Sequence, residues 1–176
     1  MNKKNKNFSK DAEKEIKSHK IKIIGFGNIL MGDDGIGIRA IEEIKKQEIF
    51  KNYKNIEIID GGTSGIDLIL TLQNTDKIII IDAVDTGHTA GSIVTFGIDE
   101  IKKMFKKNRA FKSLSLHDID LLQVFEIMKT LKIDAEIKIV GINPKKIGYS
   151  NKLSSELESS IPAIIAEIKK LAAKFI

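Results

Sequence analysis

Two aspartates and one histidine in this chain are well suited to binding a metal ion, and each follows an apolar segment. Asp34 lies in the glycine-rich run of residues 25–37, Asp82 directly follows four isoleucines, and His117 lies in a later polar loop. Two carboxylates and an imidazole suit a divalent first-row metal, with positions left open for substrate and water. The three residues come from separate loops, so the fold must bring them together.

The elements that must position these residues alternate along the chain. Apolar runs predict strands at residues 21–26, 55–60, 77–83, 92–96 and 136–142, and amphipathic segments predict helices at 35–47, 65–73, 98–106, 117–131 and 154–174. Such alternation is typical of an α/β fold. We therefore expect a three-layer α/β/α domain around a mostly parallel five-stranded sheet.

The positions of the strands in that sheet decide where the candidate ligands lie. The run of four isoleucines at 78–81 predicts a central strand covered on both faces, whereas 92–96 follows a polar loop and suggests an antiparallel edge. If strands 21–26 and 77–83 are parallel neighbours, Asp34 and Asp82 emerge at the same edge of the sheet. Open α/β sheets bind ligands at that edge.

The neighbouring acids Asp33 and Asp34 have two possible roles. A carboxylate at a helix start accepts hydrogen bonds from unpaired backbone N–H groups and is favoured by the helix dipole. We assign this capping role to Asp33 and metal ligation to Asp34. Two further histidines, His19 and His88, lie in a charged tail and in a glycine-containing loop, and they are weaker candidates.

The glycines of the first turn raise the alternative of a nucleotide site. Gly25, Gly27 and Gly32 permit positive φ or close backbone approach. The turn has Leu30 where a dinucleotide fingerprint has its third glycine, and it has no P-loop lysine. Asp60, at the end of the second strand, is nevertheless placed like a ribose-binding acid, so a nucleotide-binding enzyme stays open as an alternative.

The composition limits the possible reaction classes. The 176 residues suffice for a single domain, assigned to 21–176, after a lysine-rich tail at 1–20 that carries much of the net charge of +5. With no cysteine, the chain has no thiolate nucleophile or thiolate metal ligand. No basic stripe interleaved with aromatic residues indicates nucleic acid, and no apolar run reaches the roughly 20 residues of a membrane span. A cytoplasmic location is expected.

Several motifs together resemble those of the maturation endopeptidases of nickel-iron hydrogenases. They are GFGNILMGDDGIG at 25–37, DGGTSGIDLI at 60–69, IIIIDAVD at 78–85, SLSLHDIDL at 113–121, and VGINP with the later LSSELESSIP. Their order and spacing agree over about residues 21–170. The resemblance implies a compact α/β/α fold around a five-stranded sheet.

The same resemblance implies a set of site residues. Asp34, Asp82 and His117 match the family's metal-contacting positions, which makes them the expected catalytic and metal-binding residues. The glycine turn and the DGGT loop are expected to shape a cleft for the substrate backbone. The candidate cleft residues are Gly27, Asn28, Gly61, Gly62 and Thr63.

The implied reaction is hydrolysis of one peptide bond near the C-terminus of a hydrogenase large-subunit precursor after nickel insertion. Nickel is expected to be carried by the precursor and to serve in recognition, and the protein is expected to be a monomer. A non-catalytic nickel-binding maturation chaperone remains a second alternative.

Overall fold

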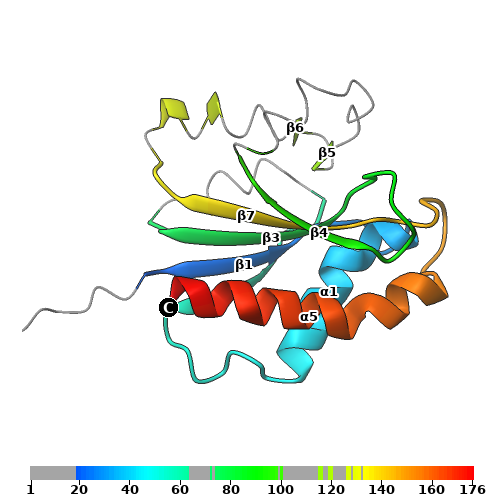
Figure 1. The fold of residues 1–176 in the computed structure, drawn as a ribbon, viewed down its shortest axis with the longest axis horizontal. Helices are drawn as coiled ribbons and strands as arrows, with labels where there is room; N and C mark the ends of the chain where they lie inside the picture. Colours follow the sequence, from blue (N-terminus) through cyan, green and yellow to red (C-terminus); the bar gives the residue numbers. More distant parts are fainter. Residues whose placement is uncertain are drawn as a thin grey trace, which may run out of the picture.

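The centre of the molecule is a five-stranded sheet with the order β2-β1-β3-β7-β4 (Figure 1). The computed structural model describes residues 19–63, 72, 74–98, 100, 115–116, 119–120, 126–127, 129–131 and 133–176. The parallel strands are β1 (Ile21–Gly25), β2 (Ile56–Asp60), β3 (Lys77–Ala83) and β7 (Glu136–Ile142), and β4 (Ile93–Gly97) is antiparallel to β7. The five predicted strands, the central β3 and the antiparallel edge are confirmed, with strand ends displaced by one residue at most.

The central strand β3 is buried on both faces. Side chains alternate between the two faces of a strand. Ile79 and Ile81 belong to the core cluster that includes residues of α1 and α5. Ile78 and Ile80 belong to a second cluster on the opposite face. An uninterrupted apolar run is therefore what this position requires.

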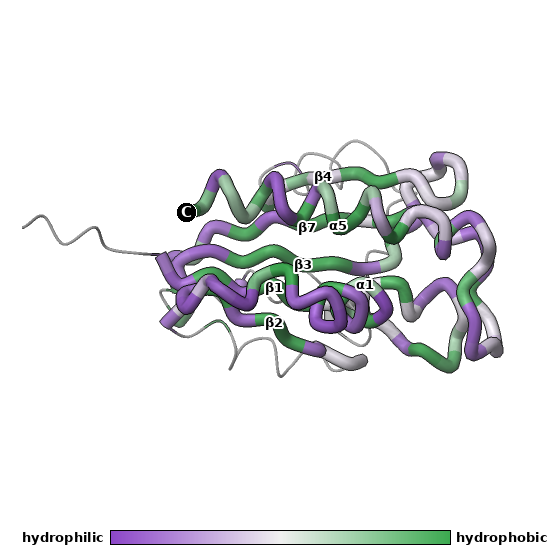
Figure 2. Tube along the Cα trace, turned by 90° about the horizontal axis from the view of Figure 1, so that it is seen from below, coloured by the Kyte–Doolittle hydropathy of each residue, from purple (hydrophilic) through white to green (hydrophobic). Residues whose placement is uncertain are grey.

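Two long helices cover one face of the sheet. A short 3₁₀ turn, η1 (Asp33–Gly35), leads into α1 (Ile36–Lys46), and α5 (Ser155–Phe175) packs beside it. Figure 1 shows both helices on the same side of the sheet, and Figure 2 shows hydrophobic residues along the central strands and hydrophilic residues on the outer side of α1. These two helices form one of the predicted helical layers.

The amphipathic segment predicted as the last helix packs its apolar side chains into the core. The buried residues of α5 include Ile164, Ile165, Ile168 and Leu171. The helix continues through Pro162 although proline has no N–H to donate. Among the described residues, no helix is long and apolar enough to cross a bilayer.

The opposite side of the sheet carries a short two-stranded element, which corrects one predicted helix. β5 (Ser115–Leu116) and β6 (Ile119–Asp120) pair antiparallel, so the segment predicted as a helix over 117–131 contains a strand near its start. The apolar residues of SLSLHDIDL recur mostly at every second position, which is a strand pattern. Most residues of the helices predicted at 65–73 and 98–106 lie outside the described residues.

Close backbone contact between α1 and the sheet depends on glycine. A Cβ atom added at Gly37, near the start of α1, would overlap the carbonyl oxygens of Phe26 and Ile81. A Cβ at Gly25 would overlap the Gly37 carbonyl oxygen. The helix start, just after Asp34 in η1, is therefore held against the end of β1 and against the part of β3 that contains Asp82.

We expect Gly37→Ala to lower the free energy of unfolding by about 1–3 kcal/mol, because backbone atoms must move to admit the methyl group. Gly148→Ala is the matched control, since a Cβ there would meet only a flexible lysine side chain at 3.8 Å. Urea unfolding monitored by circular dichroism measures both changes. Equal stability of the two variants would contradict the close-contact argument.

Candidate active site

Three loops meet at the carboxyl end of the parallel strands. β1 and β3 are parallel neighbours in which Gly25 pairs with Ile81, which meets the condition under which Asp34 and Asp82 emerge at one edge. Beyond this pair, the Phe26 N–H donates to the Ile81 carbonyl at 2.9 Å. The Gly27 N–H donates to the Gly62 carbonyl at 3.0 Å. The loops after β1, β2 and β3 therefore leave the sheet from one edge.

Asp34 is held over this edge by the turn that follows β1. Its side chain is half-buried, and its Oδ2 accepts a hydrogen bond from the Asn28 N–H at 2.9 Å. Gly27 has a φ of +139°, and a Cβ at this position would overlap the Asp34 carbonyl oxygen. Only glycine allows the chain to pass so close to Asp34.

Asp82 lies at the end of β3 and is buried. Its Oδ1 accepts a hydrogen bond from the Ala83 N–H at 2.9 Å. By strand alternation it lies on the same face as Ile78 and Ile80, which is opposite to α1 and α5. A buried carboxylate needs hydrogen-bond or ion-pair partners, and the Ala83 N–H is one partner of Asp82.

His117 lies outside the described residues. The strands that flank it, β5 and β6, lie on the side of the sheet opposite to α1 and α5, the side on which Asp82 lies (Figure 1). Within the described ranges, no three His, Cys, Asp or Glu side chains form a cluster able to hold a metal ion. The ligand set of Asp34, Asp82 and His117 therefore stays a prediction.

The candidate cleft residues lie around the same edge. The Gly61 N–H donates to the Gly25 carbonyl at 2.9 Å, and a Cβ at Gly61 would press on the ring of Phe26. Gly62 has a φ of +57°. These contacts place the DGGT loop directly against the turn after β1.

Asn28 and Thr63 complete the set of candidate cleft residues. The Asn28 side chain accepts a hydrogen bond from the Leu30 N–H at 3.0 Å, which shapes the turn that carries Asp34. Thr63 is exposed. All five candidate cleft residues are thus near the carboxyl end of the sheet, and their binding role stays a prediction.

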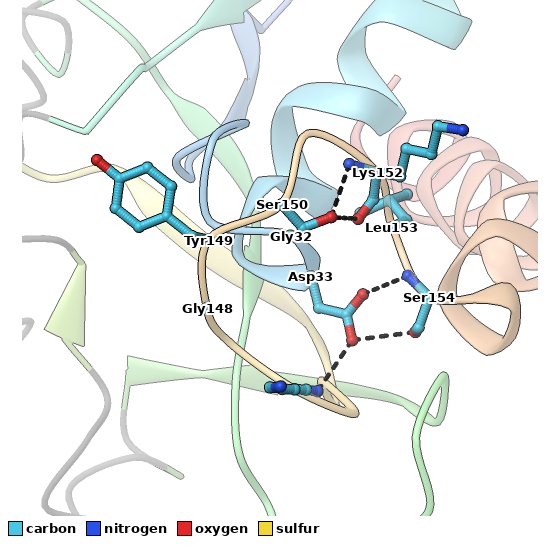
Figure 3. A pocket seen from close by; sticks show the side chains of 9 residues that line it. Gly32, Asp33, Gly148, Tyr149, Ser150, Lys152, Leu153 and Ser154 are labelled. Atoms are coloured by element: carbon cyan, nitrogen blue, oxygen red, sulfur yellow. Dashed lines mark hydrogen bonds between the residues drawn. The ribbon is translucent and has the colours of Figure 1, made fainter.

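Asp33 has a different role from the predicted cap of α1. Neither η1 nor α1 has a side-chain capping hydrogen bond at its start. The Asp33 carboxylate, only 1% exposed, accepts hydrogen bonds from the backbone N–H groups of Lys145, Lys146 and Ser154 and from the Ser154 hydroxyl. It therefore ties the turn that carries Asp34 to the segment leading into α5 (Figure 3).

This contact also changes the role of Ser154. Ser154 is the N-cap residue of α5, but its side chain makes no capping hydrogen bond. Its hydroxyl donates to Asp33 Oδ2 at 3.0 Å instead. Because the two residues are 121 positions apart, helix-start patterns in the sequence gave no sign of the contact.

Asn143, in the VGINP motif, is a structural residue that the sequence reasoning left without a role. Its buried side chain accepts from the Thr86 N–H at 2.8 Å and donates to the His88 carbonyl at 2.7 Å. It thereby holds the loop after β3 to the end of β7. An amide residue directly after a buried strand and before a proline was the available signal.

A pocket of about 270 Å³ lies beside this edge, between η1 and the segment before α5 (Figure 3). Its lining includes Asp33, Lys146, Tyr149, Lys152 and Ser154. Two of these lining residues, Asp33 and Ser154, are hydrogen-bonded to each other.

Comparisons with known proteins agree with one another. The sequence model described as hydrogenase maturation protease matches residues 38–171. The chain is 30% identical to a Methanocaldococcus jannaschii relative named as a hydrogenase maturation protease, over 88% of this chain and all of the relative. It is 27% identical to the hydrogenase 2 maturation protease of Escherichia coli, over 86% of this chain and 92% of that protein.

A solved structure has a similar fold. The hydrogenase maturating endopeptidase HybD from E. coli superposes with a TM-score of 0.73 at 24% identity. The match covers 88% of this chain and 93% of the HybD chain. This likeness confirms the α/β fold with its mostly parallel five-stranded sheet.

We expect Asp33→Ala to lower the free energy of unfolding by about 3 kcal/mol, because several buried donors lose a charged acceptor. Asp85→Ala is the control, since the exposed Asp85 carboxylate accepts a hydrogen bond from the Gly87 N–H. We expect the control to change stability by less than about 0.5 kcal/mol. Urea denaturation of both variants tests this, and a similar loss in each would argue against the tie made by Asp33.

Asn143→Ala should loosen the loop after β3. The Thr86 N–H loses its acceptor, so its hydrogen exchange is expected to accelerate by about tenfold or more, equivalent to about 1.4 kcal/mol of lost protection. Exchange at Val84 should change less, because its N–H donates to the Ile142 carbonyl. Amide exchange measured by NMR gives both rates, and unchanged exchange at Thr86 would refute this role.

Proposed function

Because the chain belongs to the hydrogenase maturation protease family, we propose that it removes a C-terminal extension from a nickel-iron hydrogenase large-subunit precursor after nickel insertion. Membership rests on a family match that covers most of the chain and on relatives matched over nearly their whole length. As a member of a protease family, the protein is a hydrolase. Its substrate, its nickel dependence and its site residues belong to the proposal.

The observation that carries the proposal is the shared edge of Asp34 and Asp82. Asp34 is held by the turn after β1, and Asp82 is the next-to-last residue of β3, the parallel neighbour of β1. Two carboxylates at one loop edge suit recognition of a metal ion that a substrate brings. Nickel in the precursor would then act as part of the substrate.

The residues of the chain position this substrate. Asp34, Asp82 and His117 contact the nickel that the precursor carries, and this contact orients the adjacent peptide bond. Gly27 and Gly61 allow close contact between the turn after β1 and its neighbours, and the space beside Gly62 is open for the substrate chain. Since the chain has no cysteine, a thiolate nucleophile is excluded. We propose direct hydrolysis by water.

The test is incubation of the purified protein with large-subunit precursors, each with and without nickel, followed by intact-mass analysis. We expect nickel-dependent loss of one C-terminal peptide. Binding without mass loss would favour the maturation chaperone. Stabilisation by a dinucleotide in a thermal-shift assay, without any cleavage, would favour the nucleotide-binding enzyme.

Asp34→Ala and Asp82→Asn are expected to lower the cleavage rate by about 100-fold or more, because misplacing the reacting bond by about 1 Å has an effect of that size. His117→Ala should lower the cleavage rate by a similar factor. Asp134→Ala, at an exposed aspartate, is the control and should cleave at the wild-type rate. Circular dichroism checks that each variant is folded, and full activity of folded Asp34→Ala would refute the proposed site.

A further inference from the structure

Two loops beside the candidate active site pair with each other through their backbones. The Ser150 N–H donates to the Leu30 carbonyl at 3.0 Å, and the Gly32 N–H donates to the Ser150 carbonyl at 2.8 Å. The Gly148 N–H donates to the Met31 carbonyl at 3.2 Å. We call the surface formed by residues 28–32 and 145–152 the platform.

The platform displays large apolar side chains to solvent. Leu30 is 57% exposed, Ile147 is 51% exposed and Tyr149 is 95% exposed, and Ile29 is exposed as well. Among the described residues, these are four of the seven large hydrophobic side chains that are exposed. Single exposed apolar residues are ordinary, but a cluster of them marks an interaction surface.

The backbone beneath these side chains is held in place. Asp33 accepts hydrogen bonds from the N–H groups of Lys145 and Lys146, and the Ser150 hydroxyl both donates to the Lys152 carbonyl and accepts from its N–H. Figure 3 shows the Tyr149 ring pointing away from Asp33 and from this hydrogen-bonded core. A surface held in this way loses little conformational entropy when a partner binds.

The charge of the platform indicates what kind of partner it fits. The Lys145 ammonium lies 2.7 Å from Glu156, and this hydrogen bond lowers the pKa of Glu156 and raises the pKa of Lys145. Lys146 and Lys152 are exposed and have no acidic group within 4.0 Å in the part of the chain that the structure describes. Both line the pocket beside Tyr149. Their ammonium groups complement acidic side chains.

The platform is continuous with the candidate site. Asn28 begins the platform, and its N–H donates to the Asp34 carboxylate. The Leu30 N–H donates to the Asn28 side chain, so Leu30 lies next to a residue that contacts Asp34. The lysine-rich residues 1–20 do not complement a basic surface, which argues against the chain's own N-terminal segment as the occupant.

We propose that the platform docks the large-subunit precursor through an apolar segment flanked by acidic side chains. The apolar side chains of that segment pack on Leu30, Ile147 and Tyr149, and its acidic groups pair with Lys146 and Lys152. The inference rests on the proposed function, because it assigns a second contact surface to the same substrate. In this proposal the platform contributes to substrate affinity, whereas Asp34 and Asp82 act at the cleaved bond.

The test compares two double variants in the cleavage assay, with a precursor that the wild type shortens. Leu30→Ser with Tyr149→Ser should raise KM by about tenfold or more, as expected for exposed anchor residues, and leave kcat within about twofold. Leu131→Ser with Tyr53→Ser, which alters exposed residues of the same types away from the platform, is the matched control. Melting temperatures check that both double variants are folded.

A charge variant tests the proposed pairing of acidic substrate groups with Lys146 and Lys152. Lys146→Glu with Lys152→Glu should raise KM at low salt, and added salt should reduce the difference from the wild type, because salt screens exposed charges. Lys54→Glu with Lys174→Glu, at exposed lysines elsewhere, is the control. Equal effects of the two charge variants would refute the acidic flanks.

Three outcomes would overturn the docking surface. The first is an unchanged KM in the apolar platform variant. The second is a fall in kcat with KM unchanged, which would place these residues in the chemical step. The third is a wild-type dimer in light scattering that the platform variant abolishes, since a second copy of the chain would then be the occupant.

Failure of the proposed protease function and failure of the docking surface give different experimental results. If the wild type shortens no nickel-loaded precursor, the same precursors are titrated in a calorimeter against the wild type and the apolar platform variant. Binding weakened by about tenfold in the variant would retain the docking surface without the protease activity. Equal affinity, or no binding to the wild type, would overturn it.

Discussion

Burial of β3 on both faces is the constraint on which the rest of the molecule depends. Its isoleucines contribute to both core clusters, and its neighbours β1 and β7 run parallel to it. Parallel strands need crossover connections, so the loops after them collect at one edge. Asp34 and Asp82 lie at one edge because β1, which precedes Asp34, and β3, which contains Asp82, are parallel neighbours in the sheet.

Glycines allow the close backbone contacts at the candidate site. Gly37 lets the start of α1 approach the carbonyl groups of Phe26 and Ile81, and Gly27 lets the turn fold back onto Asp34. The backbone contacts that pack α1 on the sheet and those that hold Asp34 are therefore only a few residues apart in the sequence. Substituting these glycines would disturb packing and site geometry together, since the same backbone atoms serve both.

Much of the fold was predictable because the physical signals are local. Apolar runs identified all five strands of the main sheet, and the unbroken run at 78–81 identified its centre. The helix predicted over 117–131 was wrong at residues 119–120, where a two-residue repeat forms a strand. The edge position of Asp34 and Asp82 followed from strand order, whereas His117 lies outside the described residues.

The sequence by itself indicated the α/β class, because apolar and amphipathic segments alternate along the chain, and its motifs indicated the protease family by resemblance. The candidate ligands that this resemblance implies stay a prediction. Only the tertiary structure decided what Asp33 does and where the platform lies. The Asp33 carboxylate bonds to Ser154, far along the chain, and Leu30 lies beside Ser150. Such contacts depend on long-range burial and backbone pairing, which no local pattern encodes.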